Sequence, residues 1–223
     1  MEDLFSSAQE YKNELFKQLS RIGKSLSSDK RLEILNLLSE SSKTVETLAE
    51  DTGMSVANVS RHLQVLKDSK LVTYTKKGTY AFYSLADPAI VDFLYALWRI
   101  GEGRLSDITQ IKRDFLDDMD GLYTLTMDEV YEKLKNEKVV LLDLRPTEEY
   151  QAAHIEGAIS VPMEKLDSYI QHLPKDKEVI AYCRGRYCAY SAIAAQKMNH
   201  QGFNAYHMAE NMYEWQKYVE LQQ

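Results

Sequence analysis

Several features are absent from this 223-residue chain, and each absence narrows its function. No run approaches the roughly 18 to 20 apolar residues that span a bilayer. We therefore expect no transmembrane helix and no membrane partner. The opening stretch, MEDLFSSAQEYKNEL, is charged and polar throughout and lacks the apolar segment of a signal peptide. Both observations predict a cytoplasmic protein.

Cysteine is also scarce. The chain has two, Cys183 and Cys188, which cannot staple a small secreted fold. With 44% hydrophobic residues the chain can bury a proper core without disulfides, and we expect two domains. A closely spaced cysteine pair in such a chain indicates redox or nucleophilic chemistry. There is no internal repeat and no low-complexity tract.

The chain also has no excess of basic over acidic residues. The net charge is −7, and it is uneven: residues 1–100 carry 13 basic and 13 acidic side chains, whereas residues 101–223 carry 14 and 21. A partner with a phosphate backbone would therefore have to meet the first half at a local basic patch, since that half has no general positive field.

The first hundred residues predict helices followed by a β-hairpin. Helices are expected after Ser28 or Asp29, over TVETLAEDTG, where Gly53 ends the helix, and after Ser55. The order of helix, glycine-containing turn and helix at 44–69 is that of a helix-turn-helix. The runs LVTYT and TYAFYSL flank a KKG turn and predict a hairpin, and DPAIVDFLYALWRIG predicts a further helix. Residues 3–26 favour a surface or dimerisation helix, with apolar positions at Leu4, Phe5, Leu15, Phe16, Leu19, Ile22 and Leu26.

The second helix of the predicted helix-turn-helix, which begins after Ser55, has the composition of a recognition helix. Short polar and basic side chains near its start can reach base edges. Lys76 and Lys77, near the hairpin tip, suit a wing that contacts phosphates. The predicted DNA-binding residues are Ser55, Ala57, Asn58, Ser60, Arg61, His62, Lys76 and Lys77.

Residues from about 20 to 100 resemble the ArsR-type winged helix through KRLEILNLL, TVETLAEDTGMSVANVSRHLQVLKDSKLV and KKGTYAFYSL. The resemblance implies a homodimer paired through its first and last helices. It also implies a repressor that binds operator DNA with two half-sites. Metal-sensing members use thiols or histidines that TVETLAE and the surroundings of Asp87 and Asp92 do not provide. We therefore predict no metal and no cofactor.

The pattern changes after a charged connector. Apolar runs VVLLDLR and EVIAYC predict buried parallel strands, and FNAYHM predicts a third. Thr126 and Glu129 predict a capping box over MDEVYEKLKNE, and YSAIAAQKMNHQG predicts a helix that Gly202 closes. Strands that alternate with helices imply an α/β domain with a central parallel sheet.

Cys183 is expected in a strand-to-helix turn, where backbone N–H groups converge and lower the pKa of a thiol. Gly185 permits the tight backbone path, and Arg184 and Arg186 add positive charge for an anionic donor or a persulfide. Cys188 either packs at the start of the helix or acts as a second thiol.

Residues 123–223 resemble the single-domain rhodanese family through VVLLDLRPTEEYQAAHIEGAISVP, the loop that begins YCRGRYC, and Trp215. The resemblance implies that Cys183 holds a sulfane sulfur as a persulfide, cradled by a loop that includes Arg184, Gly185, Arg186, Tyr187 and Cys188. It also implies that Asp143 and Arg145 organise the end of the sheet through an ion pair with Glu149. Two departures are Ala209 and Glu210, where the family often has glycines, and Cys188, where many members have Ser or Thr.

We therefore predict a mainly α winged helix-turn-helix domain over 1–102, a linker over 103–122, and a rhodanese-like α/β domain over 123–223. The favoured hypothesis is a transcriptional repressor that senses reactive sulfur or redox state through Cys183, with Cys188 as a possible resolving thiol. Its partners would be operator DNA, a second copy of the chain, and a small sulfur-containing anion or persulfide donor. The alternatives are a thiosulfate or persulfide sulfurtransferase that uses the winged helix for dimerisation, and a repressor that responds to arsenite or a soft metal.

Overall fold

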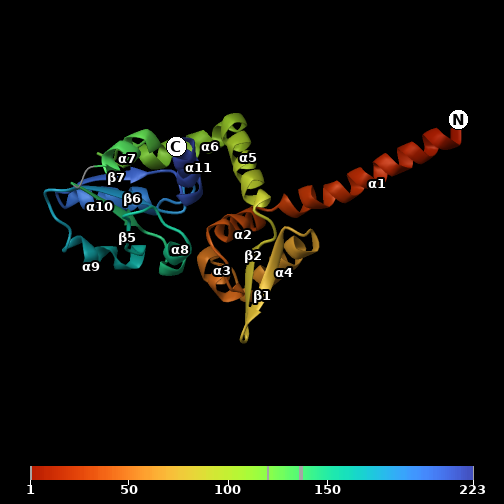
Figure 1. The fold of residues 1–223 in the computed structure, drawn as a ribbon, viewed down its shortest axis with the longest axis horizontal. Coiled ribbons are helices and arrows are strands. Elements are labelled where there is room, and N and C mark those ends of the chain that lie inside the picture. The colour runs from red at the N-terminus through yellow and green to blue at the C-terminus, as the bar shows by residue number, and fades with distance from the viewer. Residues whose placement is uncertain (1, 120, 136–137, 223) are drawn as a thin grey trace. The chain divides into compact units, whose positions relative to one another are not determined.

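The computed structural model describes residues 2–119, 121–135 and 138–222, and describes side chains from residue 6 onward. Leu4 and Phe5 of the predicted first helix therefore have side chains outside the described residues. Contacts divide the chain into two compact units, Met1–Gly101 and Glu102–Gln223 (Figure 1). Each unit is described by itself below.

The first unit contains the predicted helices. They are α1 (Glu2–Leu26), α2 (Asp29–Glu40), α3 (Val45–Thr52), α4 (Val56–Asp68) and the start of α5 (Ala89–Arg104). Ser28, Thr44 and Ser55 each cap a helix by accepting a backbone hydrogen bond in its first turn. Gly53 ends α3 in the left-handed conformation, with φ of 64°. The structure thus selects Ser28, rather than Asp29, as the cap of α2.

The core of this unit forms where α2, α3, α4 and α5 meet. Its buried side chains are mostly leucines, and they include Leu35, Leu48, Leu63, Leu66 and Leu94. Leu63 and Leu66 lie three residues apart on α4, so they share one face of the helix. The opposite face of α4 is consequently left to solvent.

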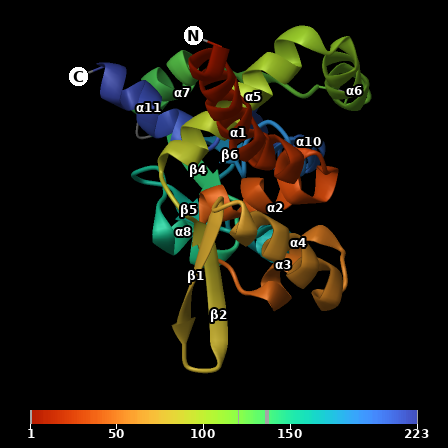
Figure 2. The same cartoon turned by 90° about the vertical axis from the view of Figure 1, so that its right-hand side faces the viewer.

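The hairpin consists of β1 (Val72–Lys77) and β2 (Tyr80–Leu85), which pair antiparallel (Figure 2). The predicted hairpin around Gly78 is confirmed, but its turn is Gly78–Thr79 and not KKG, because Lys76 and Lys77 belong to β1. A two-residue turn of this kind requires positive φ, and Gly78 supplies it at 62°. Both lysines therefore lie on the strand at the hairpin tip.

Helix α5 runs three residues past the end that the sequence predicted, through Gly101 to Arg104. A further helix, α6 (Ser106–Asp117), follows and occupies the middle of the predicted connector. Its hydrophobic residues form a stripe at helical spacing, which gives α6 an apolar side for packing.

The second unit contains a five-stranded sheet. Its strands are β3 (Thr124–Leu125), β4 (Val139–Asp143), β5 (Ile159–Ser160), β6 (Glu178–Tyr182) and β7 (Asn204–Met208). They lie in the order β3-β7-β6-β4-β5, and the four neighbouring pairs are parallel. The predicted parallel sheet is confirmed. Its two edge strands were not predicted, because two residues are too short to show a pattern.

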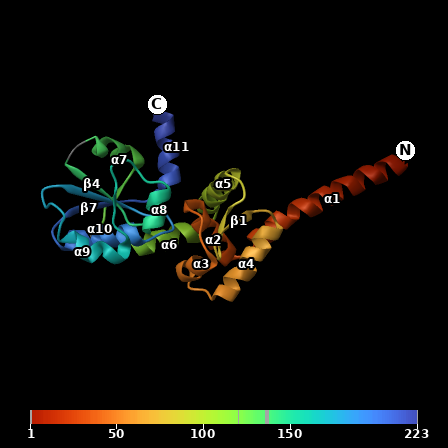
Figure 3. The ribbon, with the colours of Figure 1, turned by 60° about the horizontal axis from the view of Figure 1, so that its bottom comes forward.

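Helices cover both faces of this sheet (Figure 3). On one face α9 (Leu166–Ile170) and α10 (Tyr190–His200) pack over residues such as Leu142 and Val179. On the other face α7 (Met127–Leu134) and α11 (Met212–Gln222) pack over Ile180 and Tyr182. Helix α8 (Thr147–Ala152) and the short 3-10 helix η1 (Met163–Lys165) lie in the connections. The capping box of Thr126 and Glu129 at the start of α7 is confirmed.

No helix within the described ranges is both long enough and apolar enough to cross a membrane.

Candidate functional site

Helix α4 exposes the side chains that the sequence predicts for reading DNA. Ser55, Ala57, Asn58, Ser60 and Arg61 are exposed, and His62 is half-buried. Val59 and Leu63, between and beside them, are fully buried. The core face thus fixes the helix, and the predicted residues lie at or near the face left to solvent.

The hairpin tip carries exposed positive charge. Lys76 and Lys77 are both exposed, and the ammonium group of Lys77 lies 5.3 Å from the centre of the Phe82 ring. A cation over an aromatic face is attracted by the ring quadrupole and keeps its charge available to solvent. The tip can therefore contact phosphates.

The reactive loop, residues 183–189, connects β6 to α10 in the second unit. It brings the two cysteines together: their Sγ atoms are 2.9 Å apart and share a hydrogen bond. Cys183 is buried, Cys188 is half-buried, and both are free thiols. A disulfide needs about 2.05 Å between sulfurs, so the two thiols are adjacent but not bonded.

The two thiols titrate as one coupled pair, and their contacts favour Cys188, rather than the expected Cys183, as the thiol with the lowered pKa. The hydrogen bond between the two sulfurs lowers the pKa of Cys188 to about 7, and N–H groups of Tyr190 and Arg184 add to the effect against the cost of burial. The same bond to Cys188, together with burial, raises the pKa of Cys183 well above the ordinary value. Cys188 lies beside the start of α10, whereas Cys183 lies at the end of β6. These contacts favour Cys188 as the thiolate of the reduced pair.

Gly185 is required by two features of the reactive loop. Its φ is +90°, which side chains other than glycine rarely adopt, and an added Cβ would approach Asn211 Cβ to 3.0 Å. The Gly185 carbonyl accepts a hydrogen bond from Cys188 N at 2.9 Å, which closes a tight turn. Asn211 thus fixes the backbone between the two thiols.

Arg184 joins the reactive loop to α8. Its guanidinium forms a forked ion pair with Glu149, with Nη2 at 2.6 Å from Oε1, and Glu149 is fully buried. The sequence predicted that Glu149 would pair with Arg145, and the contact with Arg184 was missed. The positive charge of Arg184 is consequently engaged within the protein.

Asp143 and Arg145 do organise the end of the sheet. Their buried ion pair has Nη2 at 2.6 Å from Oδ2, and Arg145 also donates to the Ala153 carbonyl at 2.7 Å. The Tyr182 hydroxyl donates to Asp143 Oδ2 at 2.6 Å. Burial, and then the nearby carboxylate, raises the pKa of Tyr182, which keeps this donor protonated. Tyr182 was not predicted, although its place directly before Cys183 was a usable signal.

Arg186 is surrounded by three carboxylates. Its guanidinium lies 2.8 Å from Glu214, 3.3 Å from Glu210 and 3.3 Å from Glu102. Glu102 is at the end of α5, and it also pairs with Lys112 of α6. The sequence missed Glu102 and Glu214, because they lie 84 and 28 residues from Arg186 and no local pattern joins them.

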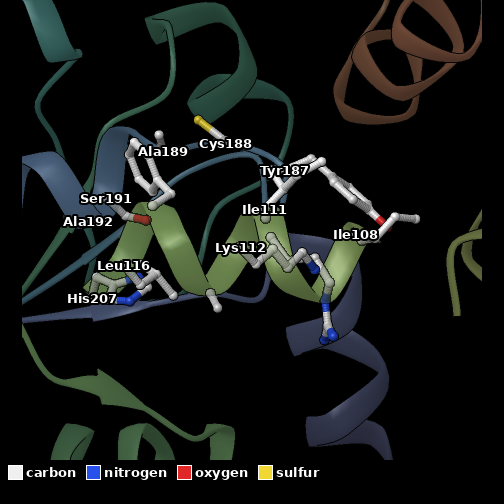
Figure 4. A pocket seen from close by; sticks show the side chains of 14 residues that line it. Ile108, Ile111, Lys112, Leu116, Tyr187, Cys188, Ala189, Ser191, Ala192 and His207 are labelled. Carbon is white, nitrogen blue, oxygen red and sulfur yellow. The ribbon is translucent and has the colours of Figure 1, made fainter. Parts of the chain in front are cut away.

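A cavity of about 460 Å³ lies between α6 and the reactive loop, within the second unit (Figure 4). Its wall is largely apolar and includes Ile108, Ile111 and Leu116 of α6. Lys112 lines it too, with its ammonium group 4.7 Å from the Tyr187 ring centre. Cys188 contributes to the wall, and Figure 4 shows its sulfur directed away from α6. The predicted residue Tyr187 therefore contacts the connector helix.

Among the residues from 2 to 222 that are described, no group of three His, Cys, Asp or Glu side chains is arranged to hold a metal ion.

Two family models match the chain in agreement with these two units. The model described as "Bacterial regulatory protein, arsR family" matches residues 28–74, and the model of the rhodanese-like domain matches residues 126–218. The HTH-type transcriptional regulator Rv0324 of Mycobacterium tuberculosis is 33% identical over 201 residues, which cover 90% of this chain and 88% of that protein. The chain belongs to the ArsR family of transcriptional regulators, with a C-terminal rhodanese-like domain.

Other relatives each match only one of the two domains of this ArsR-family regulator. The thiosulfate sulfurtransferase GlpE of Coxiella burnetii is 33% identical over 75 residues, 34% of this chain and 68% of that enzyme. A solution structure of a homodimeric winged helix-turn-helix domain from Mycobacterium bovis is 33% identical, covers 42% of this chain and 87% of that one, and has a TM-score of 0.41. The predicted family and fold class are thereby confirmed on the sequence matches and the observed topology.

We predict that Cys188 reacts as a thiolate near neutral pH. Alkylation of Cys188 by iodoacetamide should be slow below its pKa of about 7 and should rise to a plateau above it. Cys183→Ser keeps a donor for the Cys188 sulfur, so the midpoint should stay near that value. Cys183→Ala removes the donor, so the midpoint should rise towards about 8.5, the ordinary value for a thiol. Mass spectrometry of quenched samples measures the rates, and equal midpoints in the two variants would contradict the assignment.

We predict that Gly185→Ala destabilises the second unit more than Gly202→Ala. Both glycines have positive φ, but an added Cβ meets nothing within 4 Å at Gly202, whereas it meets Asn211 at Gly185. The difference in the free energy of unfolding should be about 1 to 3 kcal/mol. Urea denaturation of both variants measures it, and equal losses would show that Asn211 does not constrain the loop.

Proposed function

We propose that this ArsR-family regulator responds to sulfane sulfur, and that the paired thiols of Cys183 and Cys188 are its sensor. The observation that carries the proposal is the 2.9 Å contact between the two sulfurs, with the lowered pKa on Cys188. A thiolate attacks sulfur, and a second thiol within reach can resolve the product. A dithiol of this geometry therefore records exposure to a sulfur donor as a covalent change.

The chemistry takes two steps. The Cys188 thiolate attacks the outer sulfur of a persulfide R–S–SH, the S–S bond breaks, and R–S⁻ leaves, so that Cys188 carries the persulfide –S–SH. Cys183 then loses its proton and attacks the Cys188 sulfur, which expels HS⁻ and forms the Cys183–Cys188 disulfide. The two thiols are oxidised by two electrons, and the sulfane sulfur is reduced to sulfide. Cys188 thus has the role of attacking thiol, and Cys183 that of resolving thiol.

We assign DNA binding and dimerisation to the first unit. The exposed face of α4 and the lysines of the hairpin tip are suited to reading bases and contacting phosphates, respectively. Helix α1 presents Tyr11, Leu15 and Leu19 at intervals of four residues, each more than half exposed. Such a stripe on a long helix is typical of a surface covered by a second helix. We therefore assign a homodimer on operator DNA to the regulator.

The reactive loop can influence α5 through Arg186. Glu102, which contacts Arg186, is in the last turn of α5, and α5 begins at Ala89 in the first unit. Joining Cys183 to Cys188 constrains the loop that carries Arg186 and Tyr187, and so changes their contacts with Glu102 and Lys112. The altered end of α5 is the route by which oxidation reaches the DNA-binding unit.

Dimerisation is predicted to depend on the apolar stripe of α1. Replacing Leu15 and Leu19 together by Glu puts two like charges on each of two facing helices and should shift the protein to monomer at micromolar concentration. The matched control replaces Asn13 and Ser20 by Glu, because both are exposed and lie on the opposite side of α1. Sedimentation velocity separates the outcomes. If both double variants remain dimeric, the stripe is not the interface.

Sulfur-dependent DNA binding is the central prediction. Operator fragments are first selected by their binding to the reduced protein. After the protein is treated with an organic persulfide, its affinity for these fragments should change at least about ten-fold, or about 1.4 kcal/mol. Mass spectrometry of the same samples should show the Cys183–Cys188 disulfide. Cys188→Ser should remove the response. In the Cys183→Ser variant the reaction should stop once Cys188 carries the persulfide, because the resolving thiol is gone.

Separate measurements distinguish sulfur sensing from the two alternative functions, a sulfurtransferase and an arsenite-responsive repressor. Multiple turnovers of thiosulfate, with no operator selected, would favour a sulfurtransferase. A response to arsenite but not to persulfide would favour a metalloid sensor. If the treated and untreated wild type bind the operator equally while the disulfide forms, the sensing proposal is wrong.

A further inference from the structure

We propose that the reactive loop selects against dianionic oxoanion donors such as thiosulfate, and is oxidised instead by uncharged organic sulfane-sulfur compounds. The selectivity arises because every nearby cation is held by carboxylates of the same unit. This inference rests on the proposed function, since it names the class of donor that the dithiol accepts.

The cations beside the thiols are already neutralised. Arg184 is paired with Glu149, Arg186 with Glu102, Glu210 and Glu214, and Lys112 with Glu102. A thiosulfate dianion would have to compete with these carboxylates for the same donors. The loop therefore offers an oxoanion its backbone N–H groups, while these three side-chain cations are already engaged.

Carboxylate charge is in excess around the loop. The three cations Arg184, Arg186 and Lys112 are paired with four carboxylates, those of Glu149, Glu102, Glu210 and Glu214. A thiolate on Cys188 adds a further negative charge. Glu210 Oε2 is buried and makes no hydrogen bond within the described part of the chain. Burial raises the pKa of Glu214 even though Arg186 opposes the shift, as expected where negative charge is difficult to accommodate. A dianion that approaches Cys188 is consequently repelled.

The cations that line the adjoining cavity, Lys112 and Arg186, are those already paired with carboxylates, and the Cys188 sulfur itself is directed away from α6 (Figure 4). The wall of the cavity beside Cys188 is largely apolar. His207 lines it with less than a tenth of its surface exposed; its Nε2 shares a hydrogen bond with Thr124 Oγ1, and its Nδ1 has no partner among the residues described. Burial lowers the pKa of His207 to about 4, so the imidazole is neutral at neutral pH. The cavity thus has a largely apolar wall that includes a neutral imidazole and two cations that carboxylates already hold.

Dimethyl trisulfide is a probe of the uncharged class. The Cys188 thiolate attacks a terminal sulfur, the S–S bond breaks, and CH₃–S–S⁻ leaves, so that Cys188 carries –S–CH₃. Cys183 gives up its proton and attacks the Cys188 sulfur, which expels CH₃–S⁻. The products are the protein disulfide, methyl persulfide and methanethiol after protonation. Thiosulfate would instead transfer its outer sulfur to Cys188 and release sulfite.

The test compares second-order rates of the two donors with the full-length protein, from rapid-quench mass spectrometry of Cys188 and from release of sulfite or methyl persulfide. Wild type should react at least about 100-fold faster with dimethyl trisulfide than with thiosulfate. Glu210→Gln should raise the thiosulfate rate about five-fold and leave the trisulfide rate unchanged. Glu220→Gln, an exposed change on α11, is the matched control and should change neither rate.

A second measurement does not depend on a variant. Higher salt should accelerate thiosulfate on wild type, because screening weakens repulsion between like charges. Similar rates for the two donors, or a Glu210→Gln effect of equal size on both, would overturn the inference and leave sulfur sensing intact. Failure of both donors to modify either cysteine would instead overturn the proposed function.

Discussion

The hydrogen bond between the sulfurs of Cys183 and Cys188 is the interaction on which the chemistry of this regulator depends. It couples the two thiols, so that the pKa of one sulfur is lowered and the pKa of the other is raised. Neither thiol would have these properties alone, because burial by itself raises the pKa of a thiol. The pair is therefore a single chemical unit in which each cysteine defines the state of the other.

Much of the second unit serves to hold that pair in place. Asp143, Arg145 and Tyr182 fix the end of the central strands, and Glu149 fixes Arg184 behind the loop. Buried ion pairs of this kind add little net stability, since desolvation offsets their attraction. They do impose geometry, and geometry is what two sulfurs at hydrogen-bonding distance require.

The sequence predicted the architecture well where the pattern was local. Caps at Ser28 and Ser55, the parallel strands and the capping box at Thr126 follow from residue type and spacing alone. The site was predicted only in part. The turn between β6 and α10 could be located, but the distribution of charge between two adjacent thiols depends on which sulfur is nearer the helix amides. The partners of Arg184 and Arg186 depend on contacts across the fold, which spacing along the chain does not encode.

Helix α10 begins at Tyr190 without a side-chain cap, since Ala189 occupies the capping position. The Tyr190 amide instead bonds to the sulfur of Cys188. A thiolate thus takes the place that serine or aspartate fills at other helix starts. Once that sulfur is bound covalently to another, the anion that holds the first turn of α10 is gone. In the proposed oxidation, the start of α10 would therefore lose the anion that stands in for a capping side chain.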